Sequence, residues 1–208
     1  MDERDRWSEL CERILCPGLV ERYDTIQNSY SARNRRYHTM VHVHECLAVL
    51  DTVEHLTHRF DEVEFALWIH DLVYSTRRSD NEARSADLAQ KWLEESGADR
   101  STVDRIRGLI LATRHDAGLS EPDEALIRDI DLNVLAASPE RYDEYEAQIR
   151  KEYWWVPASL FRRRRVELLD SFLSRDRIFN TDWFRDRWEE VARANLERAV
   201  ASLDGRAF

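Results

Sequence analysis

Residues 65–74, FALWIHDLVY, form an apolar segment that carries an adjacent histidine and aspartate, His70 and Asp71, in its middle. A segment that is apolar on nearly all sides predicts a helix, here over about residues 61–73, that other helices enclose. Aspartate is almost never fully buried without a partner, and an unpaired buried carboxylate costs several kcal/mol. The pair therefore needs a counter-charge or a bound cation, which other segments of the chain must help to hold.

Helical periodicity extends along most of the chain. The chain has 5 glycines and 4 prolines, which are fewer turn-forming residues than a sheet-rich fold needs. Pro122, Pro139 and Pro157 stand where helices are expected to begin. The sequence therefore predicts one all-α domain over residues 1–208, with further helices near residues 5–15, 19–30, 38–56, 80–95, 99–115, 123–136, 139–153, 158–174 and 181–203.

Charge and composition narrow the partners and the compartment. The 31 Lys and Arg against 41 Asp and Glu give a net charge of −10, which argues against broad nucleic-acid binding and against an anionic membrane surface. Cys11, Cys16 and Cys46 do not cluster as metal ligands, and they fit reduced thiols better than a disulfide framework. The charged N-terminus lacks the apolar core of a signal peptide, and no apolar run approaches the ~20 residues of a membrane span. We expect a cytoplasmic protein with no membrane partner.

Residue types that bind metals occur at four places. Two histidines four residues apart share a helix face in YHTMVH, one histidine lies near a helix end in LATRHD, and two aspartates occur in RDIDL. Adjacent helix residues point about 100° apart, so His70 and Asp71 can reach one ion only if a neighbouring helix completes the shell. A single histidine of this kind is more often a hydrogen-bonded core residue than a metal ligand. The four places taken together predict a site for a divalent cation. The candidates are His38, His42, His70, Asp71, His115, Asp129 and Asp131.

Longer segments around these residues carry a resemblance to a known family. They are RRYHTMVHVHECL, FALWIHDLVY, SDNEARSADLA, DIDLNVL, YDEYEAQIRKEYWWVP, RVELLDSFL and ARANL. Together they resemble a subfamily of small predicted HD-domain phosphohydrolases across nearly the whole chain. The resemblance implies one HD-type helical bundle, with a metal-site core at about residues 37–135 and C-terminal helices at 139–203 packed on it. The implied metal ligands are His42, His70, Asp71 and Asp131, with Asp129 as the alternative to the last.

The implied shell of two imidazoles and two carboxylates suits Mn, Fe(II), Co, Ni or Zn better than a thiolate-preferring ion. The resemblance thus implies a hydrolase that uses a metal-activated water to cleave a phosphomonoester or a nucleotide. Nucleotide-hydrolysing members of the superfamily carry an acid shortly after the HD pair, where this chain has Val73 and Tyr74. Candidates for the missing acid or for proton transfer are Asp80, Glu82, His38 and His115.

Arginine is the side chain best suited to bidentate phosphate binding. One group of arginines, at 33, 35 and 36, precedes the His38 helix, and a second, at 77 and 78, follows the HD helix. Within the run FRRRR only Arg165 matches the subfamily pattern, and such a run is otherwise typical of a solvated helix face. The candidates for binding substrate are Arg36, Arg77, Arg78 and Arg165. The expected partner is a small phosphorylated molecule or nucleotide, with a homo-oligomer left open.

Two other functions fit the same residues. Some HD-fold proteins are mixed-valent di-iron oxygenases, but a two-iron site needs further histidines after the HD pair, and only His115 lies there. A non-catalytic, metal-stabilised module that binds a ligand or regulates a partner is favoured by the absence of an acid at Val73 and Tyr74. A hydrolase is the leading hypothesis.

Overall fold

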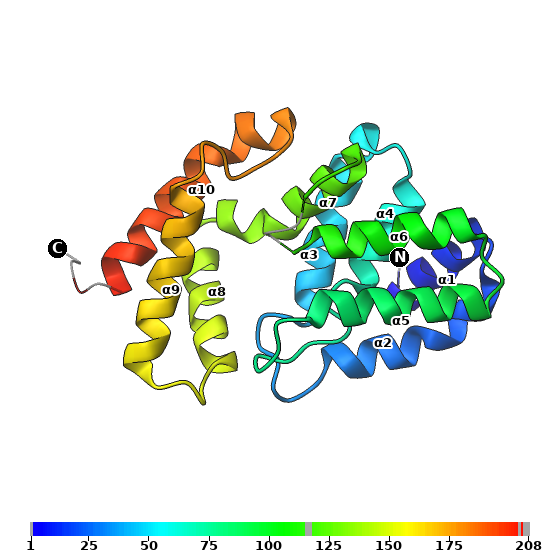
Figure 1. Cartoon of the computed structure of the whole chain (residues 1–208), viewed down its shortest axis with the longest axis horizontal. Helices are drawn as coiled ribbons and strands as arrows, with labels where there is room; N and C mark the ends of the chain where they lie inside the picture. Colours follow the sequence, from blue (N-terminus) through cyan, green and yellow to red (C-terminus); the bar gives the residue numbers. More distant parts are fainter. Residues whose placement is uncertain (1, 115–117, 204, 206–208) are drawn as a thin grey trace. The chain divides into compact units, whose positions relative to one another are not determined.

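Figure 1 shows a computed structural model of the chain, which describes residues 2–114, 118–203 and 205. Within these residues every regular element is a helix, so the prediction of an all-α fold is confirmed. The α-helices are α1 (Glu3–Arg13), α2 (Tyr23–Tyr30), α3 (Met40–Thr52), α4 (Phe60–Ile69), α5 (Asn81–Glu95), α6 (Arg100–Ala112), α7 (Pro122–Asp131), α8 (Pro139–Glu152), α9 (Ala158–Leu173) and α10 (Asp182–Leu203). Three short 3-10 helices accompany them, namely η1 (Pro17–Arg22), η2 (Glu54–Leu56) and η3 (Leu132–Ala136).

Proline marks the starts of three helices, as the sequence predicted. Pro122 and Pro139 are the first residues of α7 and α8, and Pro157 directly precedes α9. The prediction for the HD helix was wrong at its C-terminal end, because α4 ends at Ile69 rather than near Val73. Beyond Ile69 the main chain keeps local bonds, from His70 N–H to Ala66 O and from Leu72 N–H to Ile69 O, and further groups bond to side chains of other segments. The His-Asp pair therefore lies at the end of a helix, where the backbone turns, and not inside it.

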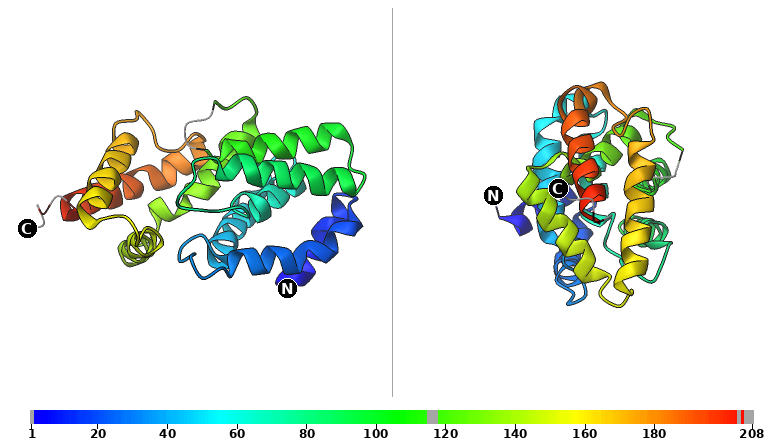
Figure 2. Two further views of the ribbon diagram at one scale, coloured as in Figure 1. Left: turned by 60° about the horizontal axis from the view of Figure 1, so that its bottom comes forward. Right: turned by 90° about the vertical axis from the view of Figure 1, so that its left-hand side faces the viewer.

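The chain forms two compact units, residues 1–131 and 132–208, and each is described by itself. In the first unit α4 contacts α1, α3, α5, α6 and α7. Figure 2 shows α4 between the green α5–α6 hairpin and the blue helices α1 and α2. Every side chain from position 63 to 70 is buried, which confirms that this helix is enclosed. The single domain with residues 139–203 packed on the metal-site core stays a prediction.

Two buried carboxylates fix α4 within the first unit. At its start, the Asp123 side chain on α7 accepts hydrogen bonds from the main-chain N–H groups of His58 and Arg59, at 2.9 and 3.0 Å. In its middle, Glu64 is 1% exposed and pairs with two arginines of α1. The Nε atom of Arg6 lies 2.6 Å from Glu64 Oε1, and Arg13 donates to the other oxygen. A buried carboxylate is tolerated here because two guanidinium groups meet it.

The second unit consists of η3 and helices α8–α10. The Asn195 amide of α10 donates to the main-chain oxygens of Leu135 and Ala137, both at 2.9 Å, and so joins α10 to the segment around η3. Aromatic rings pack at the start of α10, where Phe184 and Trp188 meet edge to face at 4.6 Å. Among the helices of the described ranges, none is sufficiently long and apolar to cross a bilayer.

Helices α1 and α5 end in the same backbone motif with different residues at its critical position. In α1, Leu15 N–H donates to Glu12 O and Cys16 N–H donates to Cys11 O. In α5, the equivalent bonds run from 97 to 94 and from 98 to 93. This Schellman motif needs a left-handed residue, and glycine adopts that conformation without strain. The position holds Gly97 (φ +80°) in α5 but Leu15 (φ +57°) in α1.

We expect Leu15→Gly to raise the free energy of unfolding by about 1 kcal/mol, because it removes the strain of a left-handed leucine. Little burial is lost, since Leu15 is 84% exposed. Gly97→Leu is the matched control and should lower stability by a similar amount. A Cβ atom at position 97 would meet no atom within 4 Å, so the expected cost of that substitution is the strain of a left-handed leucine. Urea unfolding measures both, and two changes of the same sign would contradict the argument.

Candidate metal centre

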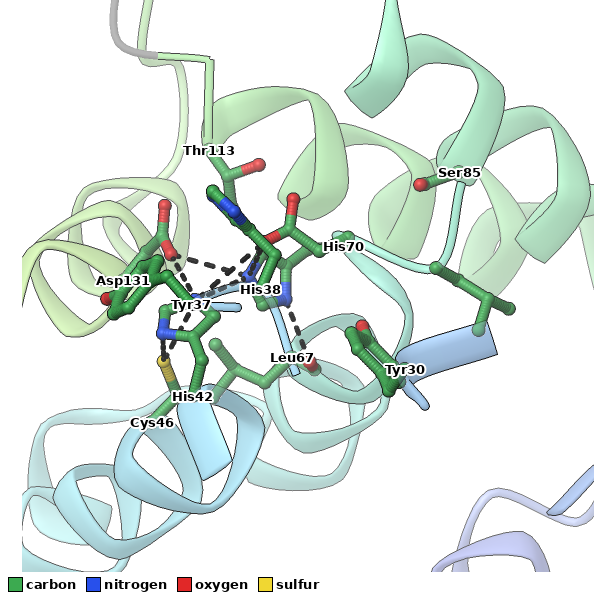
Figure 3. A network of polar contacts seen from close by, with 12 residues as sticks. Tyr30, Tyr37, His38, His42, Cys46, Leu67, His70, Ser85, Thr113 and Asp131 are labelled. Atoms are coloured by element: carbon green, nitrogen blue, oxygen red, sulfur yellow. Dashed lines mark hydrogen bonds and ion pairs between the residues drawn. The ribbon is translucent and has the colours of Figure 1, made fainter. Parts of the chain in front are cut away.

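Three side chains from three helices converge in the first unit. His42 comes from α3, His70 follows the last residue of α4, and Asp131 is the last residue of α7. Their ligand atoms lie within 4.8 Å of one another and could hold a metal ion. The two Nε2 atoms are 3.1 Å apart, and Asp131 Oδ1 lies 3.1 Å from that of His42 and 3.3 Å from that of His70. Figure 3 shows the three side chains pointing toward one another.

Asp71 adds a second carboxylate to this group. Its Oδ2 atom lies 3.3 Å from His70 Nε2 and 3.8 Å from His42 Nε2. Ligand atoms about 2.1 Å from one cation are separated by about 3.4 Å in a tetrahedral shell and about 3.0 Å in an octahedral one. The spacings of 3.1 to 3.3 Å among His42, His70 and Asp131 match three donors around one ion, and Asp71 lies next to them. The residues present therefore fit a divalent cation.

The two imidazoles are held so that Nε2 faces the centre. His70 Nδ1 lies 2.8 Å from the main-chain oxygen of Leu67, to which a proton on Nδ1 donates. This bond leaves the lone pair of Nε2 for a ligand, which is the usual support of a metal-binding histidine. The ring of His42 packs against Tyr37, with centroids 4.8 Å apart, and Cys46 Sγ lies 3.8 Å from both of its nitrogens. Both histidines are 1% exposed.

The charges of the group are coupled. Burial is the largest influence on the pKa values of these groups and disfavours their charged forms. The charges and hydrogen bonds of the neighbouring groups together outweigh it. The carboxylates of Asp71 and Asp131 raise the pKa of His70 well above its usual value. The imidazoles in turn lower the pKa of both carboxyl groups, with His70 acting most on Asp71 and His42 most on Asp131. Two ionised carboxylates side by side, one buried at Asp71 and one half-buried at Asp131, favour a positive charge between them.

Residues 71–75 take their hydrogen bonds from side chains of other segments. Arg35 donates to the main-chain oxygens of Asp71 and Leu72, at 2.7 and 2.8 Å. Ser85 bonds to both main-chain groups of Val73, and Asn81 bonds to both of Ser75. The segment SDNEARSADLA thus supplies structural contacts to the turn, through Ser85 at position 73 and Asn81 at position 75.

The predicted catalytic residues differ in their surroundings. Burial, and then the charges of Asp71 and Asp131, raise the pKa of Glu82. Asp80 instead pairs with Arg78 at 2.7 Å and with Arg84 at 2.9 Å. The ring of His38 stacks on Tyr74, with centroids 4.1 Å apart, and its charge lowers the pKa of Asp71. His115 lies outside the described residues.

The predicted phosphate-binding arginines belong to both units of the chain and differ in their surroundings. Arg36 and Arg77 are exposed residues of the first unit. Arg78 is exposed as well and pairs with Asp80. Arg165 belongs to the second unit, where it is buried and donates from Nε and Nη2 to the Glu146 carboxylate, at 3.0 and 2.7 Å. Phosphate binding by these residues stays a prediction.

Sequence reasoning missed two buried arginines that hold helix ends. Arg35 has no local signal that separates it from Arg33 and Arg36 in the polar segment before α3. Arg128 of α7 donates to the main-chain oxygens of Ala112 and Arg114, at 2.8 and 2.9 Å, and so holds the end of α6. Its position in the buried run LIRDI was a usable signal, by the reasoning applied to the His-Asp pair.

The structure also separates the two aspartates of RDIDL. Asp131 faces the imidazoles, whereas Asp129 is fully buried two residues earlier on the same helix. The group of His42, His70 and Asp131 could therefore hold a metal ion. No protein-family model, curated protein or solved structure matches the chain.

Proposed function

We propose that the protein is a metal-dependent phosphohydrolase of the HD-domain type, which cleaves a phosphomonoester or a nucleotide. The proposal is supported by one observation above all, the donor atoms of His42, His70 and Asp131 at spacings suited to one cation, with the Asp71 carboxylate beside both imidazoles. A divalent ion held by them (Mn, Fe, Co, Ni or Zn) would supply an activated water and polarise a phosphoryl oxygen.

Residues around this centre have the chemistry for the remaining steps. Glu82 replaces the acid that the resemblance expects after the HD pair, because its carboxyl lies in the field of Asp71 and Asp131 while Asp80 is engaged by two arginines. A carboxylate there can accept the proton of the attacking water. His38, held against Tyr74, can donate a proton to the leaving oxygen. Arg36 and Arg77 are the proposed contacts to the phosphate.

Metal removal and restoration tests the proposal. Purified protein stripped with a chelator should hydrolyse no member of a panel of phosphomonoesters and nucleotides, and one of the five divalent ions should restore turnover. The Asp131→Asn variant should stay inactive with every ion, whereas Asp104→Asn, at an exposed acid of α6, should behave as the wild type. If the protein binds a metal but no ion restores turnover, the non-catalytic module is the better reading. Two iron atoms per chain would favour the oxygenase.

A further inference from the structure

Arg35 is buried within a polar segment whose other arginines are exposed. Its side chain is 5% exposed, whereas Arg33 and Arg36 face solvent. Its Nη1 atom donates to Asp71 O at 2.7 Å and to His38 O at 3.1 Å, and its Nη2 atom donates to Leu72 O at 2.8 Å. One guanidinium group thus joins the segment before α3 to the turn that carries the His-Asp pair.

These three acceptors explain why the residue is an arginine. The carbonyls that follow a helix end lack partners within the helix, and a cation there also complements the helix dipole. A lysine would supply the charge, but only the planar fork of a guanidinium presents fixed donors to several carbonyls at once. Charge and geometry at position 35 can therefore be separated by experiment.

Aromatic rings restrict the guanidinium of Arg35 further. Its Cζ atom lies 5.0 Å from the ring centroid of Tyr30 and 5.3 Å from that of Tyr74. Tyr30 is itself anchored by a hydrogen bond from its hydroxyl to Trp68 O at 3.0 Å, and Tyr74 stacks on His38. Cation–π contacts of this kind add to the hydrogen bonds and limit rotation of the side chain. Arg35 is consequently a rigid support.

We propose that Arg35 is a positioning residue of the metal centre. By holding the main-chain oxygens of Asp71 and Leu72, it sets the direction from which the Asp71 carboxylate meets His70 and His42. The inference rests on the metal centre of the proposed function but not on hydrolysis. Groups that support metal ligands in this way change metal affinity by about 10- to 100-fold when they are removed.

Cobalt(II) is the probe, because its visible absorption reports the number and arrangement of its ligands. Arg35→Lys keeps the charge and removes the fork, and Arg35→Met removes both. Both variants should bind Co²⁺ about 10- to 100-fold more weakly than the wild type, with an altered spectrum. Circular dichroism checks that Arg35→Lys folds. If it does not, Tyr74→Leu tests the role of Arg35 instead, because it frees one face of the guanidinium and should alter the Co²⁺ spectrum in the same way.

Arg193 provides the matched control. This residue of α10 donates to the main-chain oxygens of Leu173 and Arg175 at the end of α9, at 3.0 and 2.8 Å, within the second unit. Arg193→Lys and Arg193→Met should lower the melting temperature and leave Co²⁺ affinity and spectrum unchanged.

Folded variants of Arg35 with wild-type affinity and spectrum would overturn the inference, and Arg35 would then serve stability alone. Absence of Co²⁺ binding by the wild type would overturn it together with the metal centre. A wild type that binds Co²⁺ and hydrolyses nothing would refute the proposed function, while the comparison of the variants would still decide the role of Arg35.

Discussion

Asp71→Asn will leave the protein folded but will lower its affinity for a divalent cation by at least about 100-fold, because Asp71 is proposed as a direct ligand, and a ligand matters at least as much as the groups that support it. The substitution preserves the shape of the side chain and the main-chain oxygen that Arg35 holds. It removes one of the two negative charges that meet His42 and His70. Hydrolysis should fall with the loss of metal.

Thermal and urea unfolding at a fixed metal concentration make this loss visible without a known substrate. A ligand at 100 times its Kd stabilises the native state by about 2.7 kcal/mol, and a 100-fold rise in Kd reduces that to about 0.4 kcal/mol. The metal-free variant should be nearly as stable as the metal-free wild type. Asp104→Asn is the control and should keep the full metal effect. Unchanged affinity in Asp71→Asn would mean that the shell has only three protein ligands.

Arg6→Met will destabilise the fold by about 3–5 kcal/mol, since it leaves the buried carboxylate of Glu64 with a single cation. The carboxylate is 1% exposed and cannot turn to solvent for compensation. Arg13, its other partner, is shared with Asp61 at 2.7 Å. Urea denaturation, with the midpoint and slope fitted separately, measures the change.

Arg4→Met on the same helix is the control for the effect of Arg6. Arg4 pairs with Asp24 where both side chains are at least half exposed, and such pairs contribute about 0–1 kcal/mol. The double variant Arg6→Met/Glu64→Met should regain most of the loss, because an apolar pair of similar volume replaces a buried charge well. If Arg6→Met costs no more than Arg4→Met, the buried charge is not what the arginine supports.

Local patterns were sufficient to place most helices, because apolar periodicity and proline are local signals. They failed after Ile69, where Leu72, Val73 and Tyr74 continue the apolar run but not the helix. Beyond the end of the helix, side chains distant in sequence, chiefly Arg35 and Ser85, bond to the main chain. Hydrogen bonds from segments distant in sequence cannot be predicted from the spacing of apolar residues.

Some residues of the candidate site could likewise be predicted from the sequence, and others could not. Residue type and spacing brought His42, His70 and Asp131 into one hypothesis, and the fold brings them together. Which arginine turns inward depends on acceptors supplied by another segment, so Arg35 could not be distinguished from Arg36 in the sequence. The choice between Asp80 and Glu82 likewise needed the positions of Arg78 and Arg84.

The hydrogen bonds that hold residues 71–75 have a consequence for how the site can diverge. Arg35, Ser85 and Asn81 bond to main-chain atoms of this segment and not to its side chains. Substitution at position 73 therefore leaves these anchors in place, whereas position 74 also carries the ring that meets the Arg35 guanidinium. A lineage can exchange Val73 for an acid, and so change the side chain two residues after Asp71, while the main-chain contacts that hold this turn are inherited unchanged.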